Sequence, residues 1–274
     1  MFSHYLLTRF NVVHNGLSQY ARKQRGTIVQ TDEWLKRRFE LFDMYCFPSV
    51  NQQSVRNFKW LVFFNEETPL NYKKRIDGYA NRCPMFHPIY VAPESDETQY
   101  AKQFILRDSS NDYIVTTRID NDDMIHRDYI KFIQNSIPSL QKNCPGGIFL
   151  CYRWGYQYNT RRKVLLKFAD NYNHFESRIE RPDALQTIWV KDDRHDLISQ
   201  YGNIKIISPD DVDNNSYPGM WIEVVHECNV VNNIGRGKPI NIHCSDFSSH
   251  LKINYLWQLL YQVDHSFNKR IRKK

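Results

Sequence analysis

The chain has 274 residues, of which 41% are hydrophobic and 24% are charged, and its net charge is +7 at pH 7. This composition is typical of a globular protein and excludes a disordered chain. The longest apolar run, residues 60–64, is far shorter than the ~20 residues that span a bilayer, and the N-terminus has the pattern of a strand rather than a signal peptide. The positive charge favours an acidic partner: nucleic acid, an anionic membrane or a phosphorylated ligand.

The six cysteines are scattered along the chain and form no C-x-x-C pair. This spacing disfavours a zinc ribbon or a thioredoxin-type site. Single cysteines spread through a chain of this size indicate reduced thiols, so we expect a cytoplasmic protein.

Strand and helix patterns alternate through residues 1–155. We expect strands at residues 5–13, 59–64, 85–91, 113–118 and 147–154, and helices at residues 31–45, 70–79, 96–107 and 126–135. Thr31 is expected to cap the first helix, and Pro48 to end it. The alternation predicts an α/β fold with an open, mostly parallel sheet flanked by helices. Ligands bind such sheets beyond the carboxyl ends of the strands.

The second part of the chain is less regular, and its polar residues 161–183 are expected to form loops. We expect short strands at residues 188–190 and 204–207, a strand or short helix at 221–226 and an amphipathic helix at 251–263. Five of the last six residues are lysine or arginine, so most of the net charge lies in this tail. The rest of the chain is close to neutral, which argues against nucleic acid as the partner.

The most informative feature is the acidic segment at residues 120–123, which follows the fourth predicted strand. Its three carboxylates, Asp120, Asp122 and Asp123, repel one another unless a cation neutralises them. Mg²⁺ and Mn²⁺ prefer such oxygen ligands and complete their shells with water and substrate phosphates. The alternative is a solvated turn in which an aspartate caps the next helix.

Several common motifs are absent from the sequence. It has no G-x-x-x-x-G-K-[ST] or G-x-G-x-x-G segment for phosphates and no G-x-S-x-G segment for a nucleophilic serine. A parallel sheet with metal-binding acids but no glycine-rich loop indicates a nucleotide-sugar site, where the ion holds the diphosphate.

A series of segments carries a family resemblance. They are H-Y-L-L-T-R-F-N at residues 4–11, W-L-x-x-R-x-x-L-F at 34–42, P-S-V-x-x-Q at 48–53, F-x-W-L-V-F-F at 58–64 with T-P at 68–69, T-T-R-I-D-N-D-D at 116–123 and, more weakly, P-x-x-W-x-x-x-V-H-x-x-N at 218–229. In this order they resemble the glycosyltransferases of the GT-A fold, in particular a bacterial family of rhamnosyltransferases. The resemblance implies one GT-A domain at residues 1–268, with a nucleotide-sugar-binding half at 1–155, an acceptor-binding half at 156–268 and a basic tail at 269–274.

The resemblance also implies roles for individual residues. Asp120 and Asp122 match the D-x-D motif and His226 matches a downstream histidine, so these three are expected to bind a divalent metal, Mn²⁺ or Mg²⁺. Asp120 is also expected to face the donor. The other residues expected to bind the nucleotide sugar are Thr8, Arg9, Asn11 and Arg118. The alternatives are an ordinary buried or surface histidine at 226, and a salt bridge from the arginine at 118 to a neighbouring carboxylate.

In the expected reaction the metal ion neutralises the leaving diphosphate. Inversion at the sugar requires a carboxylate that takes the proton of the acceptor hydroxyl. The candidates for this base are Asp193 and Asp192, beside His195, with Asp183 as a second choice. The alternative for such a group of acids is a solvated turn.

Aromatic residues suit an acceptor site because the C–H faces of sugars pack on rings. The expected acceptor-binding residues are Trp154, Tyr156 and Trp221. The alternative is that these rings belong to the core.

The expected function is a metal-dependent, inverting glycosyltransferase that transfers a sugar such as rhamnose from a nucleotide-sugar donor to a glycan or lipid-linked acceptor in surface polysaccharide synthesis. Its expected location is the cytoplasm, with the basic tail at the inner face of an anionic membrane. The alternatives are a solvated tail, a metal-dependent nucleic-acid enzyme and a non-catalytic sugar-binding protein.

Overall fold

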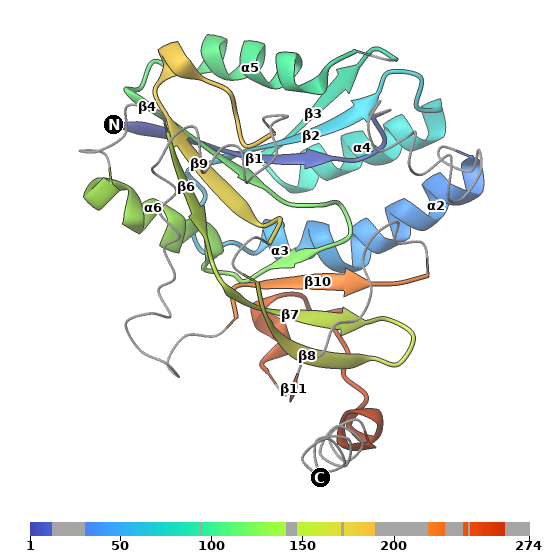
Figure 1. Cartoon of the computed structure of the whole chain (residues 1–274). Coiled ribbons are helices and arrows are strands. Elements are labelled where there is room, and N and C mark those ends of the chain that lie inside the picture. Colours follow the sequence, from blue (N-terminus) through green and yellow to red (C-terminus); the bar gives the residue numbers. More distant parts are fainter. Residues whose placement is uncertain are drawn as a thin grey trace.

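The computed structural model describes residues 1–12, 31–93, 95–140, 147–170, 173–189, 219–227, 238–240 and 242–260. Three sets of expectations lie outside these ranges: the strand at 204–207, the base candidates Asp192 and Asp193 with His195, and the tail at 269–274. The strands of the described ranges form two sheets, which lie one above the other in Figure 1.

The larger sheet has the strand order β3-β2-β1-β4-β9-β6. Its parallel part consists of β1 (Phe2–Arg9), β2 (Lys59–Asn65), β3 (Phe86–Val91) and β4 (Tyr113–Arg118). β9 (Glu176–Glu180) runs antiparallel to β4, and β6 (Ile148–Cys151) runs antiparallel to β9. The expected α/β fold with a mostly parallel sheet is therefore confirmed.

The smaller sheet has the strand order β11-β8-β7-β10-β5. β7 (Trp154–Asn159) and β8 (Val164–Ala169) form an antiparallel hairpin, and β11 (Lys238–Pro239) pairs with β8. β10 (Trp221–Val225) pairs parallel with β7 and antiparallel with β5 (Met124–Ile125). Because β5 follows the acidic segment directly, that segment lies where the two sheets meet.

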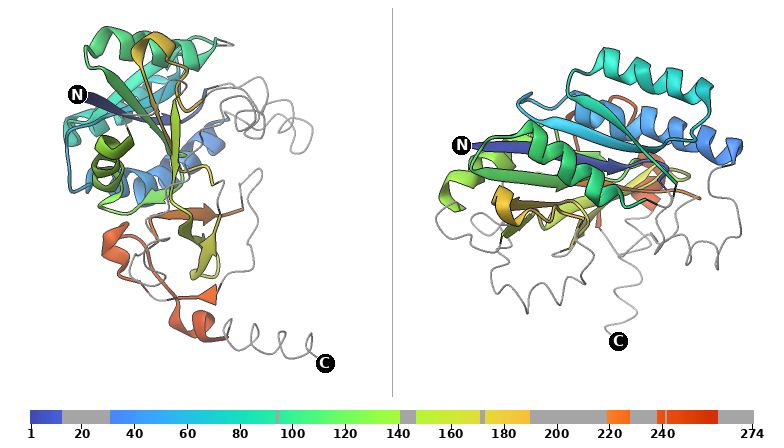
Figure 2. Two further views of the ribbon diagram at one scale, coloured as in Figure 1. Left: turned by 60° about the vertical axis from the view of Figure 1, so that its left-hand side comes forward. Right: turned by 90° about the horizontal axis from the view of Figure 1, so that it is seen from above.

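Helices cover both faces of the larger sheet (Figure 2). They are α2 (Asp32–Leu41), α3 (Phe47–Asn51), α4 (Leu70–Arg82), α5 (Glu97–Asp108) and α6 (Tyr129–Leu140), with a π-helical turn η1 (Phe42–Cys46) and a 3₁₀ turn η3 (Pro182–Ala184). A second 3₁₀ turn, η5 (Cys244–Asp246), packs with the smaller sheet. Thr31 caps α2 as expected, since its Oγ1 accepts a hydrogen bond from the Trp34 amide at 3.3 Å. Pro48 does not end the helical segment. It lies near the start of α3, which continues directly from α2 through η1.

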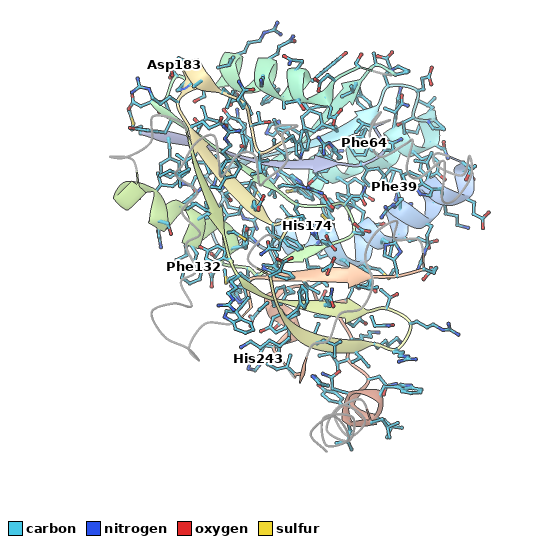
Figure 3. All side chains as sticks on the ribbon, viewed as in Figure 1. Phe39, Phe64, Phe132, His174, Asp183 and His243 are labelled. Carbon is cyan, nitrogen blue, oxygen red and sulfur yellow. The ribbon has the colours of Figure 1, made fainter. Side chains whose placement is uncertain are left out.

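Two cores form on the opposite faces of the larger sheet because successive residues of a strand point to opposite sides. Leu6 of β1 packs with α2, α4 and α6, whereas Tyr5 and Leu7 pack with α5. Phe39 of α2 and Phe64 of β2 both belong to the first core (Figure 3). Because helices cover both faces, we expect a ligand to bind this sheet at the carboxyl ends of its parallel strands.

Two elements expected in the second half of the chain differ in the structure from their predicted form or extent. Ile188 and Trp189 are buried in a turn rather than in the expected strand. The expected helix at 251–263 is helical at residues 255–260 within the described ranges, and residue 254 precedes it as a cap. No helix among the described residues has the length and apolar character needed to cross a membrane.

Candidate functional site

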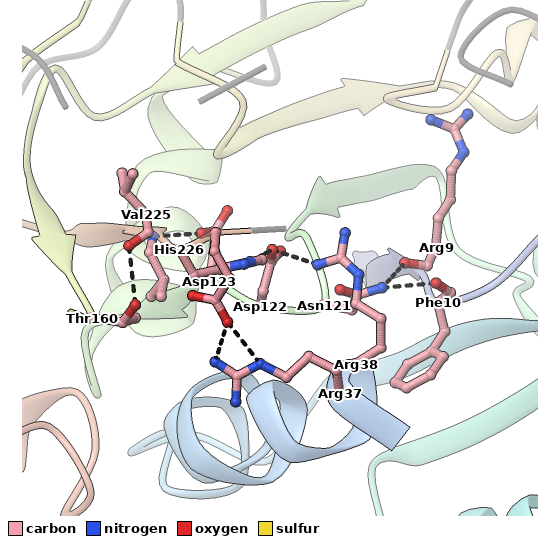
Figure 4. A network of polar contacts seen from close by, with 12 residues as sticks. Arg9, Phe10, Arg37, Arg38, Asn121, Asp122, Asp123, Thr160, Val225 and His226 are labelled. Atoms are coloured by element: carbon pink, nitrogen blue, oxygen red, sulfur yellow. Dashed lines mark hydrogen bonds and ion pairs between the residues drawn. The ribbon is translucent and has the colours of Figure 1, made fainter. Parts of the chain in front are cut away.

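The acidic segment is fixed in place by the end of β1. Asn121 donates two hydrogen bonds from Nδ2, to the carbonyls of Arg9 at 3.0 Å and Phe10 at 2.8 Å (Figure 4). The amide of Ile119 donates to the carbonyl of Leu7 at 3.1 Å. The carboxylates on either side of Asn121 therefore lie at the carboxyl ends of two adjacent parallel strands.

Asp122 is held between two cationic or imidazole groups from distant elements. Its Oδ2 accepts a hydrogen bond from Arg38 Nη1 of α2 at 2.6 Å and lies 2.8 Å from Nε2 of His226, which follows β10 (Figure 4). Burial opposes ionisation of this carboxyl, but the Arg38 guanidinium and His226 outweigh it and hold the pKa of Asp122 well below its usual range. Asp122 is therefore ionised, and the positive charge of Arg38 balances its negative charge.

Asp123 is buried and contacts a different histidine. Its Oδ2 lies 2.7 Å from Nε2 of His174, and its Oδ1 accepts a hydrogen bond from the Val224 amide at 2.8 Å. Burial raises the pKa of Asp123 to about 7, with the Asp122 and Asp120 charges adding to the rise. Burial alone would lower the pKa of His174, but its hydrogen bond and attraction to Asp123 raise it.

Asp120 is the most accessible acid of the segment. Arg118 contacts it with two nitrogens, Nε to Oδ1 and Nη2 to Oδ2, each at 3.0 Å. The two side chains keep 29% and 38% of their surface exposed, so this pair is open to a ligand. Burial opposes ionisation of the carboxyl, but the Arg118 charge outweighs it and lowers the pKa of Asp120. The salt bridge considered as the alternative role of Arg118 is present.

Three of these side chains come together as a candidate metal centre. Within the described ranges, Asp120, Asp123 and His174 are the one group of at least three such side chains whose ligand atoms all lie within 4.8 Å of one another. Two carboxylate oxygens and an imidazole nitrogen suit Mn²⁺, and they leave room for diphosphate oxygens in the shell. The expected trio of Asp120, Asp122 and His226 is not such a group among the described residues, although Asp122 and His226 contact each other at 2.8 Å.

His174 was missed in the sequence because it lies in the polar stretch expected to form loops. It stands two residues before β9, and only the pairing of β9 with β4 brings it to the acidic segment. Figure 3 shows it between the two sheets, whereas Asp183 lies at the far end of the molecule. The Asp183 side chain is 75% exposed and pairs with Arg181 at 3.6 Å, so the second-choice base is not near the acidic segment.

The four residues expected to bind the nucleotide occupy two kinds of environment. Arg9 is partly exposed: its Nε donates to Glu97 Oε1 at 2.6 Å and its guanidinium lies 4.3 Å from the Trp189 ring centroid. Arg118 contacts Asp120, as described above. Thr8 and Asn11 are buried. The Thr8 hydroxyl accepts a hydrogen bond from the Trp60 indole at 2.9 Å, and the Asn11 side chain bonds Thr68 and the Asn65 amide. The side chains of Thr8 and Asn11 thus bond neighbouring groups of the protein in this structure, and their contact with the nucleotide stays a prediction.

Two of the three expected acceptor rings belong to the core. Trp221 is 1% exposed, stacks on Phe175 at 5.0 Å between centroids and donates from Nε1 to the Tyr152 carbonyl at 2.7 Å. Tyr156 is 3% exposed, and its hydroxyl accepts a hydrogen bond from the Gly219 amide at 2.9 Å. Both rings are buried in this structure, which favours the alternative of a core role, and their contact with an acceptor stays a prediction. Trp154 is only partly buried, and its role stays a prediction.

Fold and site together define a class of protein. A mostly parallel α/β sheet with an acidic, metal-suited segment at the end of its fourth strand is the arrangement expected of GT-A glycosyltransferases. The chain belongs to the family described as "Putative rhamnosyl transferase", which matches residues 3–237. No curated protein gives a significant match to the chain.

Solved structures give distant likenesses. One is residues 1–349 of TarS from S. aureus in complex with UDP, at 10% identity and a TM-score of 0.44, covering 82% of this chain and 61% of that one. Another is described as a putative nucleotide-diphospho-sugar transferase from Desulfovibrio desulfuricans G20, at 10% identity and a TM-score of 0.33, covering 70% of this chain and 69% of that one. The chain therefore spans about three fifths of the TarS fragment.

Proposed function

We propose that this glycosyltransferase is metal-dependent and transfers a sugar, rhamnose by its family, from a nucleotide-sugar donor to a glycan or lipid-linked acceptor. The observation that supports this most is the convergence of Asp120, Asp123 and His174 at the end of β4 in a chain of this family. TarS is described in complex with UDP and with UDP-GlcNAc, which favours a nucleotide sugar as the donor here.

Mn²⁺ or Mg²⁺ fits the donor set of Asp120, Asp123 and His174. When bound there, the ion supplies Lewis-acid stabilisation of the charge that develops on a leaving diphosphate. Arg118 contacts Asp120, and Arg9 is close enough to both residues for their charges to act on its guanidinium. In the proposed complex these two guanidinium groups contact the diphosphate and balance its charge.

Asp122 has a supporting role in this proposal. Its pairing with Arg38 and His226 ties α2 and the end of β10 to the acidic segment. The ligand set expected from the family resemblance, Asp120, Asp122 and His226, is the competing proposal. Substituting His174 or His226 shows which of the two sets binds the metal. The base for inversion remains proposed at Asp193 or Asp192, and the acceptor contact at Trp154. Synthesis of a surface polysaccharide in the cytoplasm, at the inner face of the membrane, also remains a proposal.

A calorimetric screen tests the proposal. UDP, GDP and dTDP are titrated into the protein with Mn²⁺ and again with EDTA, and the corresponding nucleotide sugars are assayed for slow hydrolysis. We expect one nucleotide to bind only with metal and its sugar conjugate to be cleaved. Metal-independent binding of a sugar with no cleavage would instead support a sugar-binding protein. Salt-sensitive binding of DNA without any nucleotide binding would support a nucleic-acid enzyme.

A further inference from the structure

The last described helix, residues 255–260, is attached to the body of the protein through a polar side chain. Gln258 is 2% exposed. Its Oε1 accepts a hydrogen bond from the Leu165 amide at 3.0 Å, and its Nε2 donates to the carbonyls of Leu165 at 2.7 Å and Ile240 at 2.8 Å. A helix on the surface of a globular protein normally does the reverse, burying apolar side chains and exposing polar ones.

The apolar side chains of the same helix face solvent. Between 47% and 66% of the surface is exposed in each of the following residues: Tyr255, Leu256, Trp257, Leu259 and Leu260. They make up most of the exposed large hydrophobic residues in the described ranges. At ~100° per residue they spread over roughly 200° of the helix surface and leave the side of Gln258 for the protein. We call these five residues the apolar face.

The start of this helix is anchored. The Asn254 amide donates to the carbonyl of Lys163 at 2.9 Å, and Asn254 Oδ1 accepts a hydrogen bond from the Trp257 amide at 3.2 Å. The apolar face is therefore held outward by specific bonds to the turn between β7 and β8. In Figure 1 the helix lies beyond β8 and β11, at the end of the molecule opposite α5.

Positive charge surrounds the apolar face. Arg161, Arg162 and Lys163 in the turn between β7 and β8 are exposed, as is Lys252 just before the helix. The Arg162 guanidinium lies 6.0 Å from the Trp257 ring centroid. In the sequence, five more lysines and arginines follow among the last six residues. A second copy of the chain would bring the same charges against these, whereas an anionic surface would neutralise them.

We propose that the apolar face and the exposed basic residues described beside it, Arg161, Arg162, Lys163 and Lys252, form a docking surface for an anionic lipid bilayer. Tyrosine and tryptophan suit the depth of the headgroups, leucines enter the boundary of the acyl chains, and the cations pair with anionic headgroups. This assigns a definite surface to the membrane contact proposed above. The inference is drawn from the helix and the basic residues beside it, and it does not depend on the transferase activity.

Vesicle flotation with the full chain tests this inference. The wild type is compared with Leu256→Ser/Leu260→Ser, whose two leucines lie one turn apart on the apolar face. The matched control is Leu70→Ser/Leu106→Ser, which removes two exposed leucines, on α4 and α5, remote from this helix. The vesicles are phosphatidylcholine alone or phosphatidylcholine with phosphatidylglycerol.

We expect the wild type and the control to float with the phosphatidylglycerol vesicles and much less with phosphatidylcholine alone. The apolar-face variant should lose about tenfold or more of this binding, while its circular-dichroism spectrum and melting temperature stay those of the wild type and so show that it is folded. Equal flotation of the variant and wild type, or no flotation of the wild type, would overturn the inference. So would a concentration-dependent dimer that the variant abolishes, because the face would then belong to a second copy.

Discussion

Asp122 and Asp123 are neighbours in sequence with opposite electrostatic surroundings. Asp122 already has a protein cation, because Arg38 Nη1 lies 2.6 Å from its carboxylate and keeps it ionised. Among the described residues Asp123 contacts His174 and the Val224 amide, and burial raises its pKa to about 7. A divalent ion would relieve the second carboxylate far more than the first. This difference favours Asp123 over Asp122 as a metal ligand.

Arg38→Ala should destabilise the protein strongly. The Arg38 and Asp122 side chains are only 14% and 8% exposed, so the substitution leaves a buried carboxylate without its cation. We expect a loss of about 3–5 kcal/mol in the free energy of unfolding, measured by urea denaturation. Combining it with Asp122→Asn should restore part of this loss.

The adjacent arginine provides the control for that experiment. Arg37 pairs with Glu227 and Glu40, whose side chains are 62% and 43% exposed. Arg37→Ala should therefore cost less than about 1 kcal/mol. If Arg37→Ala and Arg38→Ala had equal effects, the buried pair would not have the structural role assigned to it here.

At the scale of elements, β9 and the smaller sheet complete the site from the second half of the chain. β9 was not predicted from the sequence because four of its five residues are polar or charged. Its Arg178 and Glu180 side chains are nevertheless only 2% exposed, and they neutralise each other at 3.0 Å. Glu180 also accepts hydrogen bonds from the Gln186 and Thr187 amides, at 2.9 Å each. Hydrophobic patterns cannot reveal a strand buried through charge pairing.

The contact between β7 and β10 depends on a missing side chain. A Cβ on Gly155 would lie 2.1 Å from the Trp221 ring, so Gly155→Ala must displace a fully buried tryptophan. We expect a loss of at least about 1–3 kcal/mol in unfolding free energy, measured by thermal or urea denaturation.

Gly78→Ala is the matched control for this substitution. A Cβ at Gly78 in α4 meets no atom within 4 Å, and alanine favours a helix over glycine by about 0.5–1 kcal/mol. It should therefore leave stability unchanged or raise it. A loss in Gly155→Ala no larger than in Gly78→Ala would mean that the two strands do not pack as closely as described.

At the scale of the molecule, the parallel half was predictable and the site was predictable only in part. The largely apolar segments at β2 and β4 predict buried parallel strands. The acidic residues after β4 then indicate the edge of the sheet at which a ligand binds. The contributions of His174 and of Arg38 depend on long-range packing, across 51 and 84 residues of sequence. The side chains of Thr8, Tyr156 and Trp221 could not be placed because a strand pattern gives burial without showing which polar or aromatic groups reach the site.

Mn²⁺ titration followed by electron paramagnetic resonance tests whether Asp120, Asp123 and His174 bind the metal, as proposed. Free Mn²⁺ is measured for the wild type, for Asp123→Asn and His174→Gln, and for the matched variants Asp122→Asn and His226→Gln. Residues that only support metal ligands typically change metal affinity by about 10–100-fold. We expect Asp123→Asn and His174→Gln to weaken Mn²⁺ binding by more than this, and Asp122→Asn and His226→Gln to stay within it. Strong loss in Asp122→Asn and His226→Gln, with little change in Asp123→Asn and His174→Gln, would contradict it.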